Sequence, residues 1–270
     1  MAFFREHVRH PLVLRTLRVS AVRRVVPTIV RVTLSGPDLD GFASDGPADH
    51  LKVFFPDPVT GIMTLPDVGP EGLRRGAAGV VISRDYTPRA SRPGELDIDI
   101  VVHGVEGPAS AWAELAKVGD GLGIAGPRGS RLVPEGIERL VIVADETALP
   151  ATGRWLELLP ADVPVTALFH VVDETVEGYF DSAAAARMDA EWITHADGHR
   201  QLEESLRSLG RIDAGTFVFL AGEADILVPL RRYLRHELSL PAEQVSASGY
   251  WRRGVVNLDH HAPLDPSDPD

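Results

Sequence analysis

The chain has 270 residues, contains no cysteine and carries a formal net charge of −12. The absence of cysteine excludes disulfide bonds and cysteine-ligated iron–sulfur clusters, so electron transfer would require a bound cofactor. The acidic balance argues against general nucleic-acid binding. No apolar run has the form of a signal peptide or the length of a membrane span. We therefore expect a soluble, cytoplasmic protein, monomeric by default, with neither nucleic acid nor a membrane as a partner.

The first half of the sequence predicts short strands separated by glycine and proline. In the second of them Val30, Val32 and Leu34 alternate with Arg31 and Thr33, which is the period of a half-buried strand. The predicted strands are residues 13–25, 29–34, 50–55, 79–83 and 97–102. Several short strands of this kind are typical of a small antiparallel β-barrel.

The second half predicts a different architecture. Residues 140–144 are continuously apolar, as in a parallel sheet covered on both faces. Further strands (163–171, 191–194, 216–221, 245–248) alternate with helices (149–159, 181–188, 201–209, 226–238). This alternation predicts a doubly wound α/β domain. We expect domains at residues 1–133 and 134–262, followed by an acidic, proline-rich tail at 263–270 that is disordered.

The motif Arg84-Asp85-Tyr86-Thr87-Pro88-Arg89 combines a cation, an aromatic ring and a hydroxyl. A guanidinium can pair with a pyrophosphate in two-pronged geometry, and Arg84 and Tyr86 share a face in an extended segment. The Thr87 hydroxyl can bond a ring nitrogen, whereas Pro88 should end regular strand pairing. These groups suit a dinucleotide with a planar redox ring, although an isolated match would equally describe a strand end with a surface salt bridge.

A second motif, Gly107-Pro108-Ala109-Ser110, opens a helix predicted to continue to residue 117. Proline suits the first helical position, and the following backbone N–H groups have no partner within the helix. The helix dipole favours an anion beside them, so the helix start can bind phosphate. A surface helix with no ligand is the alternative interpretation of this tetrapeptide alone.

These motifs occur in a fixed order with several others. The further blocks are Val102-His103-Gly104, Trp112-Ala113, Gly126-Pro127-Arg128-Gly129-Ser130, Asp145-Glu146-Thr147-Ala148-Leu149-Pro150 and Gly249-Tyr250-Trp251-Arg252. With them the chain resembles the siderophore-interacting proteins, which are FAD-dependent ferric-siderophore reductases related to the ferredoxin reductases. The resemblance covers nearly the whole chain.

The resemblance implies FAD and NADPH or NADH as cofactors. The implied cofactor-binding residues are Arg84, Tyr86, Thr87, Arg89, Val101, Val102, His103, Gly107, Pro108, Ala109, Ser110, Thr147 and Pro150. A G-x-G-x-x-G fingerprint is absent, so binding of the pyridine nucleotide rests on the resemblance. Thr147 could alternatively cap a helix. Arg231 and Arg232 are candidates for a 2′-phosphate contact, or simply a solvated helix face.

The resemblance also implies a basic substrate pocket formed by Lys52, Arg128 and Arg252, with Arg253 as a competitor for the role of Arg252. Taken singly, each residue is more often part of a surface ion pair. We expect no protein metal site and no side chain that acts as acid, base or nucleophile, because the cofactor carries the chemistry.

The function implied by the resemblance is reduction of a ferric siderophore. Electrons pass from NAD(P)H, or from a ferredoxin as an alternative donor, through FAD to Fe(III), and Fe(II) is released. A general NAD(P)H:flavin or quinone oxidoreductase would not need the three cations, and a non-enzymatic siderophore-binding protein would not need the flavin. The role of Tyr250 and Trp251 stays open between core packing, the flavin edge and the substrate pocket.

Overall fold

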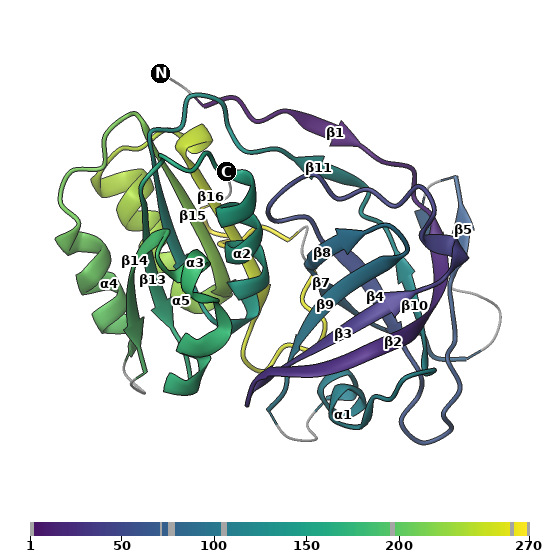
Figure 1. Cartoon of the computed structure of the whole chain (residues 1–270). Coiled ribbons are helices and arrows are strands. Elements are labelled where there is room, and N and C mark those ends of the chain that lie inside the picture. Colours follow the sequence, from purple (N-terminus) through teal and green to yellow (C-terminus); the bar gives the residue numbers. More distant parts are fainter. Residues whose placement is uncertain are drawn as a thin grey trace. The chain divides into compact units, whose positions relative to one another are not determined.

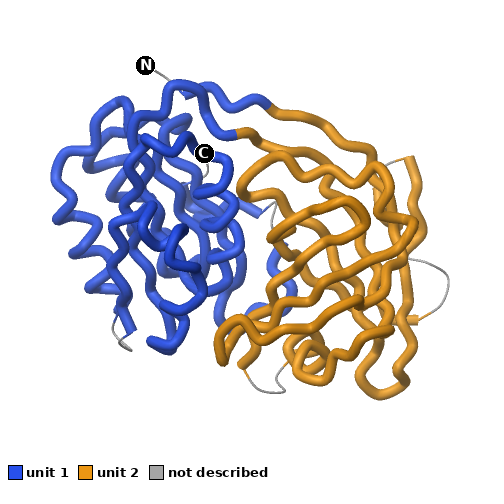
Figure 2. Tube along the Cα trace, in the orientation of Figure 1, with its two compact units in different colours: residues 1–6, 133–270 blue, residues 7–132 orange. Residues whose placement is uncertain are grey.

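The computed structural model describes residues 3–70, 72–74, 79–103, 107–194, 198–259 and 262–268. The chain divides into two compact units (Figure 2). One comprises residues 7–132 and is called the barrel unit; the other comprises residues 1–6 and 133–270 and is called the α/β unit. Within the described residues, no helix is both long and apolar enough to cross a membrane.

The barrel unit is built on a seven-stranded antiparallel sheet that curls on itself (Figure 1). Its strands, in spatial order, are β7 (Ile82–Tyr86), β4 (Leu51–Phe55), β10 (Gly121–Ala125), β2 (Leu14–Val26), β3 (Ile29–Ser35), β9 (Glu95–Val101) and β8 (Pro88–Arg92). Two ribbons accompany it, β1 (His7–Arg9) with β11 (Gly129–Arg131) and β5 (Asp67–Gly69) with β6 (Gly72–Arg74). The predicted antiparallel, barrel-like domain is confirmed.

The curl depends on a corner at Thr87. Strands β7 and β8 stand at opposite edges of the sheet, yet only Thr87 separates them in the sequence. The chain pairs with β4 before the corner and with β9 after it. The prediction that Pro88 ends strand pairing is therefore wrong, because Pro88 begins β8 opposite Ile98. The register shifts between Pro88 and Ala90, an irregularity that tolerates the missing N–H.

Helix α1 (Pro108–Leu115) closes part of the barrel core. Its residues Ala109 and Ala113 are buried in the same apolar cluster as the inward-facing residues of β3, β4 and β9. The Trp112 ring packs edge-on against Phe55 at 5.6 Å, and Phe55 in turn contacts Tyr86 at 6.2 Å. One aromatic group thus links the helix to the corner strand β7.

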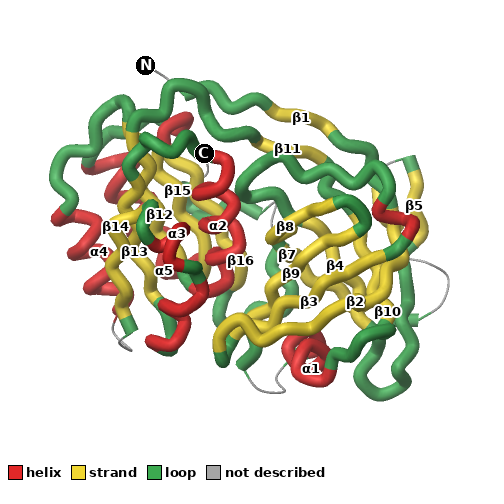
Figure 3. Tube along the Cα trace, in the orientation of Figure 1, coloured by secondary structure: helices red, strands yellow, loops and turns green. Residues whose placement is uncertain are grey.

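The α/β unit contains a five-stranded parallel sheet (Figures 1 and 3). The spatial order is β14 (Met188–Ile193), β13 (Val165–His170), β12 (Arg139–Ala144), β15 (Thr216–Glu223) and β16 (Val245–Trp251). The helices are α2 (Leu149–Leu158), α3 (Ser182–Ala185), α4 (Gly198–Ser208) and α5 (Ala224–Arg232). The first strand of this sheet in the sequence, β12, lies in the middle, and the later strands are added on both sides of it. The predicted doubly wound fold is therefore confirmed.

Alternate residues of β12 face different helices. Val141 and Val143 pack in one cluster with residues of α4 and α5. On the opposite face, Trp155 of α2 lies 5.5 Å from Phe217 and 5.6 Å from Phe219, both on β15. Both faces of the sheet are therefore covered, which explains the continuous apolar run in the sequence.

Both ends of the chain contact the α/β unit. Phe3 meets Phe217 edge-on with ring centres 5.6 Å apart, and the Arg5 guanidinium lies 5.5 Å from the Trp155 ring centre. The tail at residues 263–270, whose composition predicts disorder, is described over residues 263–268, and these lie against the end of α5. There Asp265 and Asp268 form ion pairs with Arg232 and Arg231.

Candidate functional site

The corner between β7 and β8 carries the first predicted flavin-binding motif. The strand register places Arg84 opposite Val53 and Tyr86 opposite Leu51, so Arg84 and Tyr86 share one face of the sheet. Arg84 Nη1 donates to the Ser83 carbonyl at 2.7 Å. Burial raises the pKa of the Tyr86 hydroxyl further above neutral pH, and Thr87 is only 8% exposed at the corner itself. The motif thus presents a cation beside a neutral aromatic ring.

The start of α1 carries the second motif. Gly107 precedes the helix with φ of 87°, Pro108 occupies its first turn, and no side chain caps it. A methyl group on Gly107 would meet nothing within 4 Å among the described residues. N–H groups without a side-chain cap at a helix start attract an anion, so this helix start suits a phosphate group.

The end of β9 is tied to this helix. The His103 N–H donates to the Ser110 hydroxyl at 3.1 Å, and the Val102 N–H donates to the Thr28 carbonyl at 2.8 Å. Ser110 and Val102 are buried, whereas His103 is exposed. Gly104 of the predicted motif lies outside the described residues. The structure therefore brings the strand end and the helix start together.

The three predicted substrate-binding cations are not equivalent. Lys52 Nζ bonds both carboxylate oxygens of Asp85, at 2.9 and 3.0 Å. Arg252 Nε lies 3.0 Å from an Asp225 oxygen. Arg128 is exposed, and within the described part of the chain no carboxylate pairs with it. Lys52 and Arg128 belong to the barrel unit and Arg252 to the α/β unit.

The two arginines considered for a 2′-phosphate are already engaged. Arg231 is 4% exposed and bonds Asp268 at 2.8 Å, while Arg232 bonds Asp265. The alternative interpretation of a solvated face is wrong for Arg231, because its side chain is buried. Arg253 was the alternative to Arg252 for the substrate-binding role. Its backbone N–H donates to Glu223 Oε1 at 3.1 Å.

The carboxyl ends of β12 and β15 meet where the strand order of the sheet reverses. Ligands of doubly wound sheets bind in the crevice at this position. Thr147 lies there in a short 3₁₀ turn, η2 (Glu146–Ala148), while Pro150 is buried in the first turn of α2. The residue that caps η2 is Asp145, whose side chain accepts from the Thr147 N–H at 2.8 Å. The N-cap of α2 is Ala148, without a side-chain hydrogen bond, so the alternative that Thr147 caps this helix is wrong.

Sequence reasoning missed the part that Asp145 plays at this crevice. Its carboxylate accepts from the Glu223 N–H at 2.8 Å and from Trp251 Nε1 at 2.8 Å, as well as from Thr147. Burial raises the pKa of Asp145 despite these hydrogen bonds. Its position in the sequence could have indicated this role, because an acid directly after a buried parallel strand lies at the ligand-binding edge of the sheet.

Glu146, the next residue, is a second carboxylate in a desolvated position. Burial, together with the neighbouring charge of Asp145, raises the pKa of Glu146 to about 7. Hydrogen bonds from backbone N–H groups, including that of Val172, act in the opposite direction. At this edge of the sheet burial therefore opposes the ionisation of both acids.

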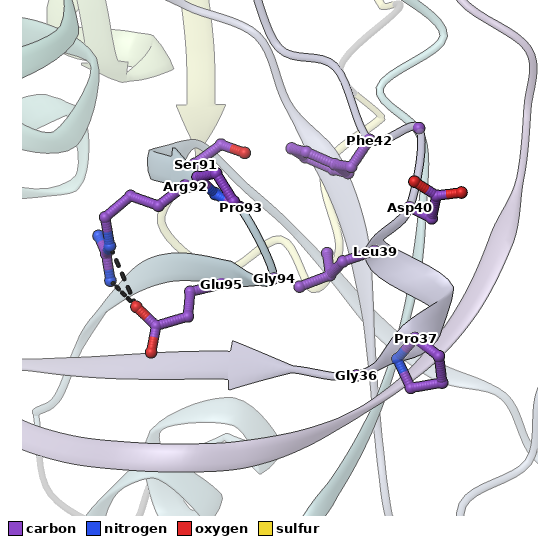
Figure 4. Close-up of a pocket in the computed structure, with 11 residues that line it drawn as sticks. Gly36, Pro37, Leu39, Asp40, Phe42, Ser91, Arg92, Pro93, Gly94 and Glu95 are labelled. Atoms are coloured by element: carbon purple, nitrogen blue, oxygen red, sulfur yellow. Dashed lines mark hydrogen bonds and ion pairs between the residues drawn. The ribbon is translucent and has the colours of Figure 1, made fainter.

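A separate pocket of about 570 Å³ lies in the barrel unit (Figure 4). It lies between the loop after β3, which includes Leu39 and Phe42, and the turn from β8 to β9. Its arginine, Arg92, bonds Glu95 and also Asp97. None of the predicted site residues lines it. Across the described residues, no group of three His, Asp or Glu side chains is arranged to hold a metal ion.

Family models match both units. The siderophore-interacting FAD-binding domain matches residues 18–131, and the siderophore-interacting protein model matches residues 137–254. The chain belongs to the siderophore-interacting protein family. This agrees with the resemblance stated from the motifs.

Relatives from two bacteria match nearly end to end. The NADPH-dependent ferric-chelate reductase of Escherichia coli is 35% identical, over 91% of this chain and 96% of its own. The ferric vibriobactin reductase ViuB of Vibrio cholerae is 32% identical, over 88% of this chain and 89% of its own.

Solved structures agree with the fold. A siderophore utilization protein from T. fusca is 42% identical with a TM-score of 0.85, covering 96% of this chain and 100% of its own. SipS from Aeromonas hydrophila is 31% identical with a TM-score of 0.76, covering 92% and 94%. A flavohemoglobin from Malassezia yamatoensis, 15% identical over 91% of this chain and 62% of its own with a TM-score of 0.62, shares the fold.

Proposed function

We propose that the protein is an FAD-dependent reductase of ferric siderophores that uses NADPH and acts in the cytoplasm. The observation that carries the proposal is the end-to-end similarity to two relatives named as ferric reductases. The uncapped start of α1 beside the end of β9 supports it, because a redox dinucleotide needs a site for its pyrophosphate.

In this proposal the barrel unit holds FAD. Arg84 and the helix start at Pro108 bind the pyrophosphate from two sides, and Arg89 adds positive charge after the corner. Tyr86 and Thr87 orient the flavin ring. When bound, FAD supplies the conversion of a two-electron donor into single electrons for Fe(III). The contribution of the protein is positioning, since no side chain has to act as acid or base.

Lys52, Arg128 and Arg252 bind the ferric chelate in this proposal. Many ferric siderophores are anionic, and a net charge of −12 would repel them without a local basic surface. Arg128 is exposed and has no carboxylate partner among the described residues, so it offers the strongest attraction. Lys52 is partly neutralised by Asp85 and contributes less.

Two substitutions test this division of roles. Arg84→Ala should purify with less FAD, measured as flavin absorbance per protein, because one pyrophosphate contact is lost. Arg128→Ala should keep its flavin and lose turnover of anionic ferric chelates. Loss of flavin from Arg128→Ala would show that the assignment to substrate is wrong.

The donor and the reaction class are tested by anaerobic stopped-flow on the FAD-loaded protein. NADPH, NADH and a reduced ferredoxin are offered separately, and ferric catecholate and hydroxamate chelates follow. Bleaching of the flavin by NADPH and its reoxidation by a chelate would support the proposal. Bleaching without reoxidation by any chelate would favour a general flavin or quinone reductase, and chelate binding by a protein that takes up no FAD would favour a carrier.

A further inference from the structure

Asp145 accepts hydrogen bonds from three separate segments of the α/β unit. Its Oδ1 accepts from the N–H and the hydroxyl of Thr147 in η2. Its Oδ2 accepts from the Glu223 N–H at the end of β15 and from the Trp251 indole N–H at the end of β16, each at 2.8 Å. The carboxylate therefore joins the ends of two strands to the turn that follows a third.

The surroundings of Asp145 are shaped for an ionised carboxylate. All four groups that face it are donors, and a carboxylate can accept from all of them. The position next to it on β15 is Gly222, where a methyl group would come within 2.6 Å of the carboxylate carbon. Only glycine leaves room for this side chain, so the strand and the acid fit each other.

The register of β16 directs Trp251 to this acid. Gly222 pairs with Gly249, but Glu223 pairs with Trp251, so Tyr250 is an extra residue in β16. A bulge of this kind changes the direction of the side chain that follows it. Trp251 is 38% exposed although its indole N–H is bonded to a buried acid. One part of the ring is therefore fixed inside the protein while another part faces solvent.

We propose that Asp145 is a positioning residue that holds the Trp251 indole as an aromatic wall of the nucleotide crevice, against which the nicotinamide ring of NADPH packs. The crevice lies where the strand order reverses, the position at which doubly wound sheets bind their ligands. An indole fixed by its N–H offers a flat apolar face to a planar ring without losing rotational freedom on binding. The identity of the ligand rests on the proposed function.

The experiment follows the indole N–H signals of the FAD-loaded protein by ¹H–¹⁵N NMR. The chain has four tryptophans. Trp251→Phe identifies the Trp251 signal by its loss, and Trp192→Phe is the matched control, since Trp192 stacks on Phe169 in β13 and is not bonded to Asp145. Adding NADP⁺, which cannot reduce the flavin, should shift the Trp251 signal and leave the Trp192 signal in place.

Affinity gives a second readout. Trp251→Ala should raise the Kd for NADP⁺ about five-fold, from the loss of one aromatic stacking contact. Trp192→Phe should leave the Kd unchanged. Asp145→Asn should move only the Trp251 signal and speed its exchange with solvent, because the new amide NH₂ faces donors. If Asp145→Asn does not fold, Trp251→Phe still isolates the indole N–H, and it should raise the Kd about two-fold.

The possible outcomes separate this inference from the proposed function. A Trp251 signal that does not respond to saturating NADP⁺, or a Kd unchanged in Trp251→Ala, would overturn the inference. A wild-type protein whose Trp251 signal responds to NADP⁺ but which reduces no ferric chelate would overturn the proposed function and support the inference.

Discussion

Two strand acids of the barrel unit and Asp145 of the α/β unit are stabilised in different ways. In the barrel unit, acids on β9 and β7 pair with cations directly across the sheet, as Asp99 does with Arg31 and Asp85 with Lys52. In the α/β unit, Asp145 is surrounded by neutral N–H and O–H donors. An ion pair fixes two side chains on one sheet, whereas an acid with several neutral donors can join separate segments.

This difference matters for what each surface can bind. A cation that is already paired offers less attraction to an anionic ligand, so the pairs of the barrel unit serve mainly the sheet. Asp145, at the edge of the parallel sheet, bonds only the indole N–H of Trp251, so the exposed part of Trp251 can still contact a ligand. Three substitutions sharpen the comparison, from the largest effect to the smallest.

The Asp99–Arg31 pair should show the largest effect on stability. Asp99→Ala leaves the Arg31 guanidinium, 17% exposed, without its two short bonds to the carboxylate. We expect the free energy of unfolding to fall by about 3 kcal/mol. Glu95→Ala is the control on the same strand, since its pair with Arg92 is exposed and should contribute less than about 1 kcal/mol. Equal losses in urea denaturation would contradict the role of burial.

Glu146 should make the α/β unit sensitive to pH. Its pKa is about 7 in the fold against 4.5 as the ordinary value, so ionisation opposes folding. Stability should fall as pH rises from the ordinary value towards the folded one. Glu146→Gln removes the charge and should stabilise the protein by about 2 kcal/mol at pH 8, with little gain at pH 5. Urea denaturation at both pH values measures this, and the same gain at both would contradict it.

Asp85 should have the smallest effect, on substrate affinity. Asp85→Asn frees the charge of Lys52, so an anionic ferric chelate should bind about three-fold more tightly while stability changes by less than about 1 kcal/mol. Asp189→Asn, on the exposed side of β14, makes the same change in net charge and is the control. Weaker binding to Asp85→Asn would mean that the pair instead orients Lys52 for the substrate.

Local patterns were sufficient to predict most elements of the fold. Alternation predicted β3 and β9, and continuous apolar runs predicted β12 and β15, because burial on one or two faces leaves its period in the sequence. The corner at Thr87 could not be predicted in the same way. Its geometry depends on which strands β7 and β8 pair with, and those partners are distant in sequence. Local propensity therefore predicted, wrongly, that strand pairing ends at Pro88.

The parts of the candidate site differ in the same way. The motif at Arg84 and the helix start at Pro108 are contiguous stretches, so their chemistry could be read directly. The hydrogen bond between Asp145 and Trp251 joins residues that are far apart in the sequence, and it depends on an irregularity in β16. The ion pair of Lys52 with Asp85 likewise requires the strand register. Neither of these two contacts produces a pattern within a short stretch of sequence. Both can be explained once the strand order and register are known.

The attachment of the first residues to the α/β unit has a consequence for biosynthesis. Phe3 is 8% exposed and packs on Phe217, which leaves the ribosome long after it. Since domains tend to fold as they emerge, the barrel unit can form while the N-terminal segment still has no partner. A fusion at the N-terminus should therefore disturb completion of the α/β unit, although the barrel unit is its nearest neighbour in the sequence.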